Sequence, residues 1–208
     1  MRNLLFRLPC PRLRPPDVRG RPAAGLSALA LGVALCLGLP QSAGAAQAAY
    51  TIQGRVVQVA DGDTLTLLRG RQRVRVRLAS IDAPEIGHSR QRPGQPYGQA
   101  ARRALAELVA GKTLALRCYE QDRYGREICD VPLADGRTAS QALVAGGLAW
   151  ANLQGGGKYL RDDTLPGLQR QARQRGLGLW QAPGPVAPWE WRWKCWQALE
   201  TGKTTTIC

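Results

Sequence analysis

The stretch Asp61-Gly62-Asp63-Thr64 places two carboxylates on a glycine turn, and Ile81-Asp82-Ala83-Pro84-Glu85 places two more a short way along the chain. Between them, Gln72–Leu78 alternates arginine with apolar residues, which is the pattern of a half-buried strand. Each acidic cluster therefore lies where a strand meets a turn. Either cluster alone is common turn chemistry, because Asp and Gly favour turns. The two together at this spacing are far more specific.

The residue types in these two stretches point to phosphoryl-transfer chemistry. Carboxylates held on turns, such as those of Asp61, Asp63, Asp82 and Glu85, suit a hard divalent cation, which prefers oxygen ligands from several chain segments. Arg77 ends the intervening strand and brings a permanent positive charge beside that cation. A metal ion and an arginine together stabilise the charge that develops when a phosphate ester is attacked.

Hydrophobic patterning predicts a small α+β domain. Stretches rich in β-branched and apolar residues predict five strands, over residues 50–60, 64–68, 72–79, 113–120 and 127–133. Apolar residues at helical spacing predict helices over residues 98–110 and 139–145, and a third from near Pro166 to Gly176.

Residues 1–49 have the organisation of a secretory signal: an arginine-rich start, an apolar run over Leu26–Leu39, and small residues before Tyr50. The apolar run is shorter than the roughly 20 residues that a membrane-spanning helix needs. An uncleaved membrane anchor is the alternative. We predict cleavage, export to the periplasm or the medium, and no stable membrane span in the mature protein.

The charge of the chain favours polyanionic partners. The 208 residues carry a net charge of +14. Residues 1–49 contain six arginines and one aspartate, so the remainder has 23 basic and 14 acidic residues and a net charge of +9. Such a surface attracts nucleic acids through counterion release and long-range attraction. Anionic membranes and polysaccharides attract cations as well, so charge alone does not decide the partner.

Four cysteines follow the predicted signal, and an even number in an exported chain indicates disulfides. Cys118 and Cys129 flank the turn between two predicted strands, whereas Cys195 and Cys208 lie close together near the C-terminus. We predict the pairs Cys118–Cys129 and Cys195–Cys208, because each closes a short local loop. A loop of this length stabilises by roughly 3 kcal/mol in the chain-entropy model.

The predicted mature chain divides into a domain over residues 50–181 and a C-terminal tail over residues 182–208. The tail contains four tryptophans beside two cations: Trp189, Trp191, Trp193 and Trp196, with Arg192 and Lys194. Tryptophans beside cations can form a stacking platform for bases. The alternative, which we favour, is that the indoles pack on the domain.

Five short strands with a helix between the third and the fourth follow the order of an OB-fold barrel. The stretch Thr51–Trp180 resembles the staphylococcal nuclease (thermonuclease-like) family in four motifs: Asp61–Thr64, Arg77–Glu85, Tyr97-Gly98 and Asp122–Arg126. The resemblance implies an α+β fold, in which a five-stranded OB-fold β-barrel carries three helices. The tryptophan-rich tail is an addition to this plan.

The resemblance also implies a metal and its ligands. Enzymes of this family use calcium to cleave DNA and RNA with little sequence preference. Position by position, Asp63 and Asp82 are then the carboxylate ligands of Ca²⁺, and Ala83 supplies a backbone carbonyl where the best-known member has threonine. Glu85 is expected to hold and activate the attacking water. Whether Glu85 acts as the base or only positions the water is not decided by the sequence.

Arg77 and Arg126 are the arginines that the resemblance assigns to the phosphate. A phosphodiester gains negative charge as water attacks, and a guanidinium fork can bind two of its oxygens at once. Tyr124 matches a tyrosine of the family's pocket, and we expect it to bind substrate together with Arg123.

One stretch departs from the family pattern. The best-known member has two tyrosines after its second helix that position the nucleotide, whereas Leu148–Gly155 of this chain has none. Trp150 and Tyr159 are the candidates to replace them.

Two function classes follow from these observations. The first is an exported calcium-dependent endonuclease that acts on DNA, RNA or both, as a monomer without a protein partner. The second is a non-catalytic nucleic-acid-binding module on the same fold. A pure binding module has no need to retain the carboxylates of the metal site together with Arg77, Glu85 and Arg126. The sequence therefore favours the enzyme.

Overall fold

The computed structural model describes residues 49–208, so the predicted signal peptide lies outside the described residues except for its last position. Within residues 49–208, no helix has the length and apolar character needed to cross a bilayer.

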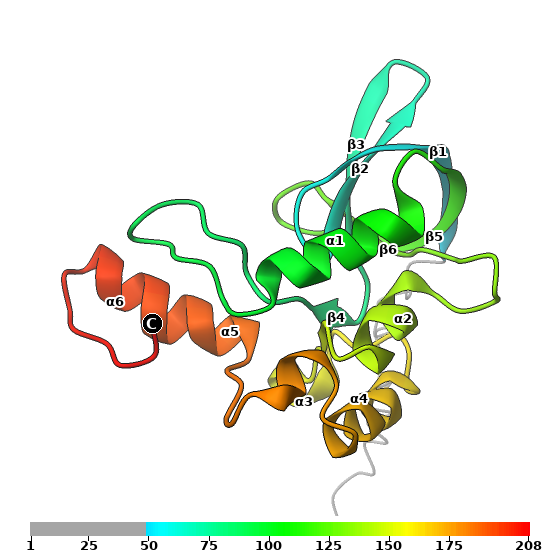
Figure 1. The fold of residues 1–208 in the computed structure, drawn as a ribbon. Coiled ribbons are helices and arrows are strands. Elements are labelled where there is room, and N and C mark those ends of the chain that lie inside the picture. The colour runs from blue at the N-terminus through cyan, green and yellow to red at the C-terminus, as the bar shows by residue number, and fades with distance from the viewer. Residues whose placement is uncertain (1–48) are drawn as a thin grey trace, which may run out of the picture. The chain divides into compact units, whose positions relative to one another are not determined.

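Five strands close into a barrel in the order β1-β2-β3-β6-β5 (Figure 1). Their bounds are β1 Tyr50–Val59, β2 Thr64–Arg69, β3 Gln72–Leu78, β5 Thr113–Gln121 and β6 Glu127–Asp130. Neighbouring strands are antiparallel except β3 and β6, which run parallel. Two further strands, β4 (Ile81–Asp82) and β7 (Trp150–Ala151), pair with each other in a separate small sheet. The predicted OB-fold barrel is confirmed.

The alternation in β3 decides which residues face the core. Val76 and Leu78 are buried, whereas Arg73 and Arg75 on the opposite face are exposed, as the two-residue period of a strand requires. Arg77 lies on the arginine face but is only partly exposed, because it lies at the end of the strand beside the acidic turns.

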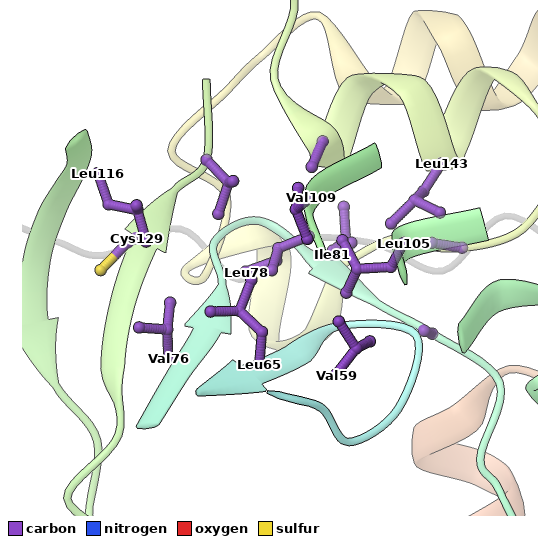
Figure 2. Close-up of a cluster of buried hydrophobic side chains, with 14 of the residues drawn as sticks. Val59, Leu65, Val76, Leu78, Ile81, Leu105, Val109, Leu116, Cys129 and Leu143 are labelled. Carbon is purple, nitrogen blue, oxygen red and sulfur yellow. The ribbon is translucent and has the colours of Figure 1, made fainter. Parts of the chain in front are cut away.

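Two helices pack on the barrel and seal its core: α1 (Gly98–Val109) and α2 (Ala139–Ala145). Leu105 and Val109 of α1 and Leu143 of α2 pack in one cluster with Leu65 and Leu78 of the barrel (Figure 2). All five side chains are almost completely buried. Each buried side chain of this size contributes about 1.5–3 kcal/mol relative to exposure.

The third predicted helix is α4 (Leu165–Gln174), which packs against α2. Short helical turns extend the predicted set: α3 Gln154–Gly157, η1 Gly178–Gln181, α5 Pro188–Trp191, the π-helical turn η2 Arg192–Trp196, and α6 Gln197–Glu200. The last three elements form the tail, which in Figure 1 lies beside the long loop between β4 and α1.

Both predicted disulfides are present. Cys118–Cys129 joins the paired strands β5 and β6, and Cys195–Cys208 closes the tail. The tail tryptophans differ in exposure: Trp191 is buried, Trp189 and Trp196 are half-buried, and Trp193 is 68% exposed. The packing alternative therefore holds for Trp191, and Trp193 remains on the surface.

Candidate active site

The first acidic turn folds around Asp63. The Asp61 carboxylate accepts a hydrogen bond from the Asp63 amide at 2.9 Å, which fixes the turn. One oxygen of Asp63 accepts from the Thr64 hydroxyl at 3.0 Å. The other oxygen, Oδ2, accepts from the Ala83 amide, also at 3.0 Å. This last bond joins the two acidic stretches, and Asp63 is only 3% exposed.

Two glycines allow both acidic stretches to lie against the start of α1. A Cβ atom on Gly62 would lie 2.6 Å from the Cβ of Ala101 and 2.7 Å from that of Ala83. A Cβ atom on Gly98 would lie 2.3 Å from the carbonyl oxygen of Glu85. Only glycine allows approaches this close, so these positions set how near the two carboxylate clusters come.

Arg77 bridges the two buried aspartates. Its Nη1 lies 2.8 Å from Asp63 Oδ1, and its Nη2 lies 2.8 Å from Asp82 Oδ1. Asp82 is only 1% exposed. Burial raises the pKa of Asp63, and the charge of Arg77 opposes that rise. Burial would lower the pKa of Arg77, but the two carboxylates outweigh it and raise that pKa. The three charges are thus held by mutual compensation, as buried charges require.

A second arginine reaches the same carboxylates from the tail. Arg192 Nη2 lies 2.6 Å from Asp82 Oδ2, and Arg192 Nη1 donates to Asp82 Oδ1 at 3.2 Å. The same Nη1 also pairs with Glu85. Burial raises the pKa of Glu85 to about 7, although the charge of Arg192 acts to lower it. Arg192 was not among the predicted site residues, because its only signal in the sequence is that of a cation among the tail tryptophans.

The turn between β5 and β6 carries Arg126, the other arginine predicted to bind the phosphate. Arg126 Nε and Nη2 lie 2.7 and 2.6 Å from Asp122 Oδ2, and the amides of Tyr124 and Arg126 donate to Asp122 Oδ1. Burial would raise the pKa of Asp122, but the hydrogen bonds from Arg126 and Tyr124 lower it. The Tyr124 ring is 61% exposed and contacts the guanidinium groups of Arg123 and Arg126, 4.8 and 5.5 Å from its centroid.

These segments surround one cleft of about 690 Å³. Its lining includes all eight predicted site residues: Asp63, Arg77, Asp82, Ala83, Glu85, Arg123, Tyr124 and Arg126. Of the two candidates to replace the family's missing tyrosines, Tyr159 lines this cleft. Trp150 instead packs edge-on against Trp180 and Trp189, with ring centroids 4.5 and 5.9 Å apart.

Comparison with known proteins identifies the family of the chain. Residues 75–182 match the family described as staphylococcal nuclease homologue. The chain belongs to the staphylococcal nuclease family. An uncharacterized endonuclease of Escherichia coli O157:H7 is 43% identical over 141 residues, covering 68% of this chain and 85% of that protein. A micrococcal nuclease of Shigella flexneri is 37% identical over 177 residues, covering 81% and 92%.

A less similar relative matches over a shorter stretch of the chain. The staphylococcal-like nuclease CAN1 of Arabidopsis thaliana is 35% identical over 121 residues, which is 58% of this chain and 34% of that protein.

The donor atoms of the site suit a hard cation, but the carboxylates are not gathered into a metal shell. Within residues 49–208, no three His, Cys, Asp or Glu side chains group closely enough to hold a metal ion. Arg77 and Arg192 pair with the carboxylates in this arrangement. Asp63 and Asp82 nevertheless provide two buried anionic oxygen donors on a cleft, which is the chemistry that calcium prefers.

Proposed function

We propose that the protein is an exported, calcium-dependent endonuclease that hydrolyses phosphodiester bonds of DNA, RNA or both with little sequence preference. The observation that carries the proposal is that two buried aspartates, a glutamate and the predicted phosphate-binding arginines line a single cleft. Membership of the staphylococcal nuclease family and the nuclease names of its relatives support the same activity.

Asp63 and Asp82, with the Ala83 carbonyl, are the proposed ligands of Ca²⁺. When bound, the ion supplies positive charge to the phosphate oxygens and to the attacking water. Asp63 is already fixed by the Thr64 hydroxyl, the Ala83 amide and Arg77, so its carboxylate cannot rotate freely. Such fixed ligands favour catalysis because little reorganisation is needed during the reaction.

Glu85 is the proposed partner of the attacking water. It lies on the same turn as Asp82 and faces the cleft, where a carboxylate can orient a water or accept its proton. Its peptide is held in place, because its amide donates to the Gln95 side chain at 3.1 Å and its carbonyl accepts from the Gln95 amide at 2.8 Å.

The two arginines have different proposed roles. Arg77 holds Asp63 and Asp82 at both ends of its guanidinium, so it positions the metal ligands in addition to supplying positive charge. Arg126 forms an ion pair with Asp122 of the same β5–β6 turn, and it lines the cleft beside Tyr124. We therefore propose that Arg126 makes the main direct contact with the phosphate, because its guanidinium fork can bind two phosphate oxygens.

Export is supported by the two disulfides, because such bonds form and persist in oxidising compartments. The arginine-rich, apolar and small-residue order of residues 1–49 supports the same conclusion.

The direct test is to incubate the purified mature protein with supercoiled plasmid DNA and with single-stranded RNA, first with calcium and then with a calcium chelator. We expect cleavage of at least one substrate in calcium and none in chelator. Retardation of intact DNA in a gel, with no cleavage in either condition, would instead establish the nucleic-acid-binding module.

A further inference from the structure

The tail is attached to the loop that follows the second acidic turn. The indole nitrogens of Trp191 and Trp196 both donate to the carbonyl of Pro93, at 3.1 and 2.9 Å. Gln95 on the same loop donates to the Val186 carbonyl at 2.9 Å. Trp191 is buried, so these contacts hold the adjacent Arg192 at the cleft.

Arg192 and Arg77 together occupy both oxygens of Asp82. Oδ1 accepts from both guanidinium groups, and Oδ2 lies 2.6 Å from Arg192. Arg192 also neutralises Glu85. The Asp82 side chain is 1% exposed and that of Arg192 is 35% exposed, so Arg192 approaches the carboxylate from the open side of the cleft.

We propose that Arg192 is an internal counter-ion of the metal site: a divalent cation must displace it from Asp82 and Glu85, and it thereby sets the affinity of the protein for that cation. The inference rests on the proposed metal site at Asp63 and Asp82. Arg192 occupies Asp82 Oδ2 and pairs with Glu85, so a metal ion that takes these oxygens must take the place of the Arg192 nitrogens. Binding of the metal and the Arg192 contact therefore oppose each other.

The residue type fits this role. A guanidinium stays charged up to about pH 12, so the competition from Arg192 does not fade as the pH rises across the neutral range. Its two nitrogens match the two oxygens of one carboxylate, as they do at Asp82. The tail thus adds a second guanidinium to that of Arg77 and helps to compensate the buried carboxylates.

The test is the calcium dissociation constant of the full mature protein, measured by isothermal titration calorimetry without nucleic acid. Arg192→Gln is compared with the wild type and with Lys194→Gln. The control removes one positive charge from the same tail, at a residue whose ion pair is with Glu190 and not with the site. We expect Arg192→Gln to bind calcium on the order of tenfold more tightly, in the usual range for coupled ligands. Lys194→Gln should bind calcium as the wild type does.

A second variant, Arg192→Lys, tests whether any change in calcium affinity comes from a folding defect. Arg192→Lys keeps the charge but loses the fork, so it should fold like the wild type and tighten calcium binding by a smaller factor than Arg192→Gln. The rise in melting temperature on adding calcium should be smallest in the wild type, larger in Arg192→Lys and largest in Arg192→Gln.

The outcomes separate this inference from the proposed function. Equal calcium affinities in the wild type and both Arg192 variants, with plasmid cleavage intact, overturn the counter-ion role and leave the nuclease standing. Weaker binding in Arg192→Gln also overturns it, because Arg192 would then support the site. Absence of calcium binding in every variant, together with absence of cleavage, removes the metal site and this inference with it.

Discussion

Asp82 is compensated by two arginines from distant parts of the chain, and Asp63 is compensated by one of them and by two neutral donors. Breaking a buried pair by removing one partner typically costs 3–5 kcal/mol, because the remaining charge is left without compensation. We therefore propose both a structural and a chemical role for Arg77. Arg126 is partnered by the partly exposed Asp122 at the cleft wall, so its contribution to the reaction is easier to isolate.

Replacing Arg126 by lysine should lower kcat by about a hundredfold, which corresponds to roughly 3 kcal/mol in the transition state, the cost of losing one oriented donor. Lysine keeps the charge but cannot bind two phosphate oxygens with one fork. The measurement is kcat and KM on DNA. Arg137→Lys is the matched control, since Arg137 makes a similar pair with Asp135 in another turn that does not line the cleft. An unchanged kcat in Arg126→Lys would reduce Arg126 to a surface charge.

At the scale of elements, the β5–β6 hairpin is built to present its turn. The disulfide Cys118–Cys129 joins its strands, and the Asp122 carboxylate holds the turn from within. The fifth predicted strand, over residues 127–133, extended to Leu133, but β6 ends at Asp130, before Pro132, which has no amide to donate to a ladder. The turn that carries Arg126 is therefore held at its base by a covalent bond and at its tip by hydrogen bonds.

Asp122→Ala should lower kcat by about tenfold or more while changing KM less, because Arg126 loses the partner that orients it for the transition state. Asp122→Asn retains an oxygen for the two amides and should recover part of the loss. Asp135→Ala, made in the comparable turn outside the cleft, should leave both constants unchanged. If Asp122→Ala and Asp135→Ala behave alike, Asp122 has no role in positioning Arg126.

Two tyrosines tie strands of the barrel to carboxylates of β6, and they predict how stability changes at high pH. Burial and the hydrogen bond to Glu127 raise the pKa of Tyr50 to about 12. Burial and the hydrogen bond to Asp130 raise that of Tyr119 to about 12. Because these pKa values lie above the unfolded value of about 10, the stabilisation is complete below pH 10 and is lost as the pH rises toward 12.

The measurement is the free energy of unfolding by urea at several values between pH 9 and pH 12. We expect the decline with pH to be shallower in the Tyr50→Phe, Tyr119→Phe double variant than in the wild type, since phenylalanine does not titrate. Parallel declines in the two proteins would show that neither tyrosine contributes to the pH dependence.

At the scale of the whole molecule, the sequence predicted those parts that depend on local pattern. The arginine alternation fixed β3, the glycines after α1 and α2 fixed their ends, and both disulfides close short loops. The predicted site residues share one cleft because their motifs lie at strand ends and turns that the barrel brings together.

What the sequence did not predict depends on tertiary contacts. β4 and β7 have two residues each, too few for any period to appear. Arg192 reaches Asp82 because tertiary contacts hold the tail on the β4–α1 loop, among them those from Trp191 and Trp196 to the carbonyl of Pro93. No local pattern in the tail specifies that carbonyl as the partner. A cation beside aromatic residues therefore looked like a packing or stacking segment rather than part of the site.

The central claim is that Asp63 and Asp82 bind the calcium ion that the reaction requires. The most direct measurement is the rate of plasmid cleavage by Asp63→Asn and by Asp82→Asn in saturating calcium, alongside the calcium affinity and melting temperature of each protein. Asparagine keeps the shape but removes the anionic ligand and one anionic partner of Arg77, so both variants should be folded but melt at a lower temperature than the wild type. Both should bind calcium weakly and cleave at least about a hundredfold more slowly. Near-normal cleavage by a folded Asp63→Asn or Asp82→Asn protein would contradict the account.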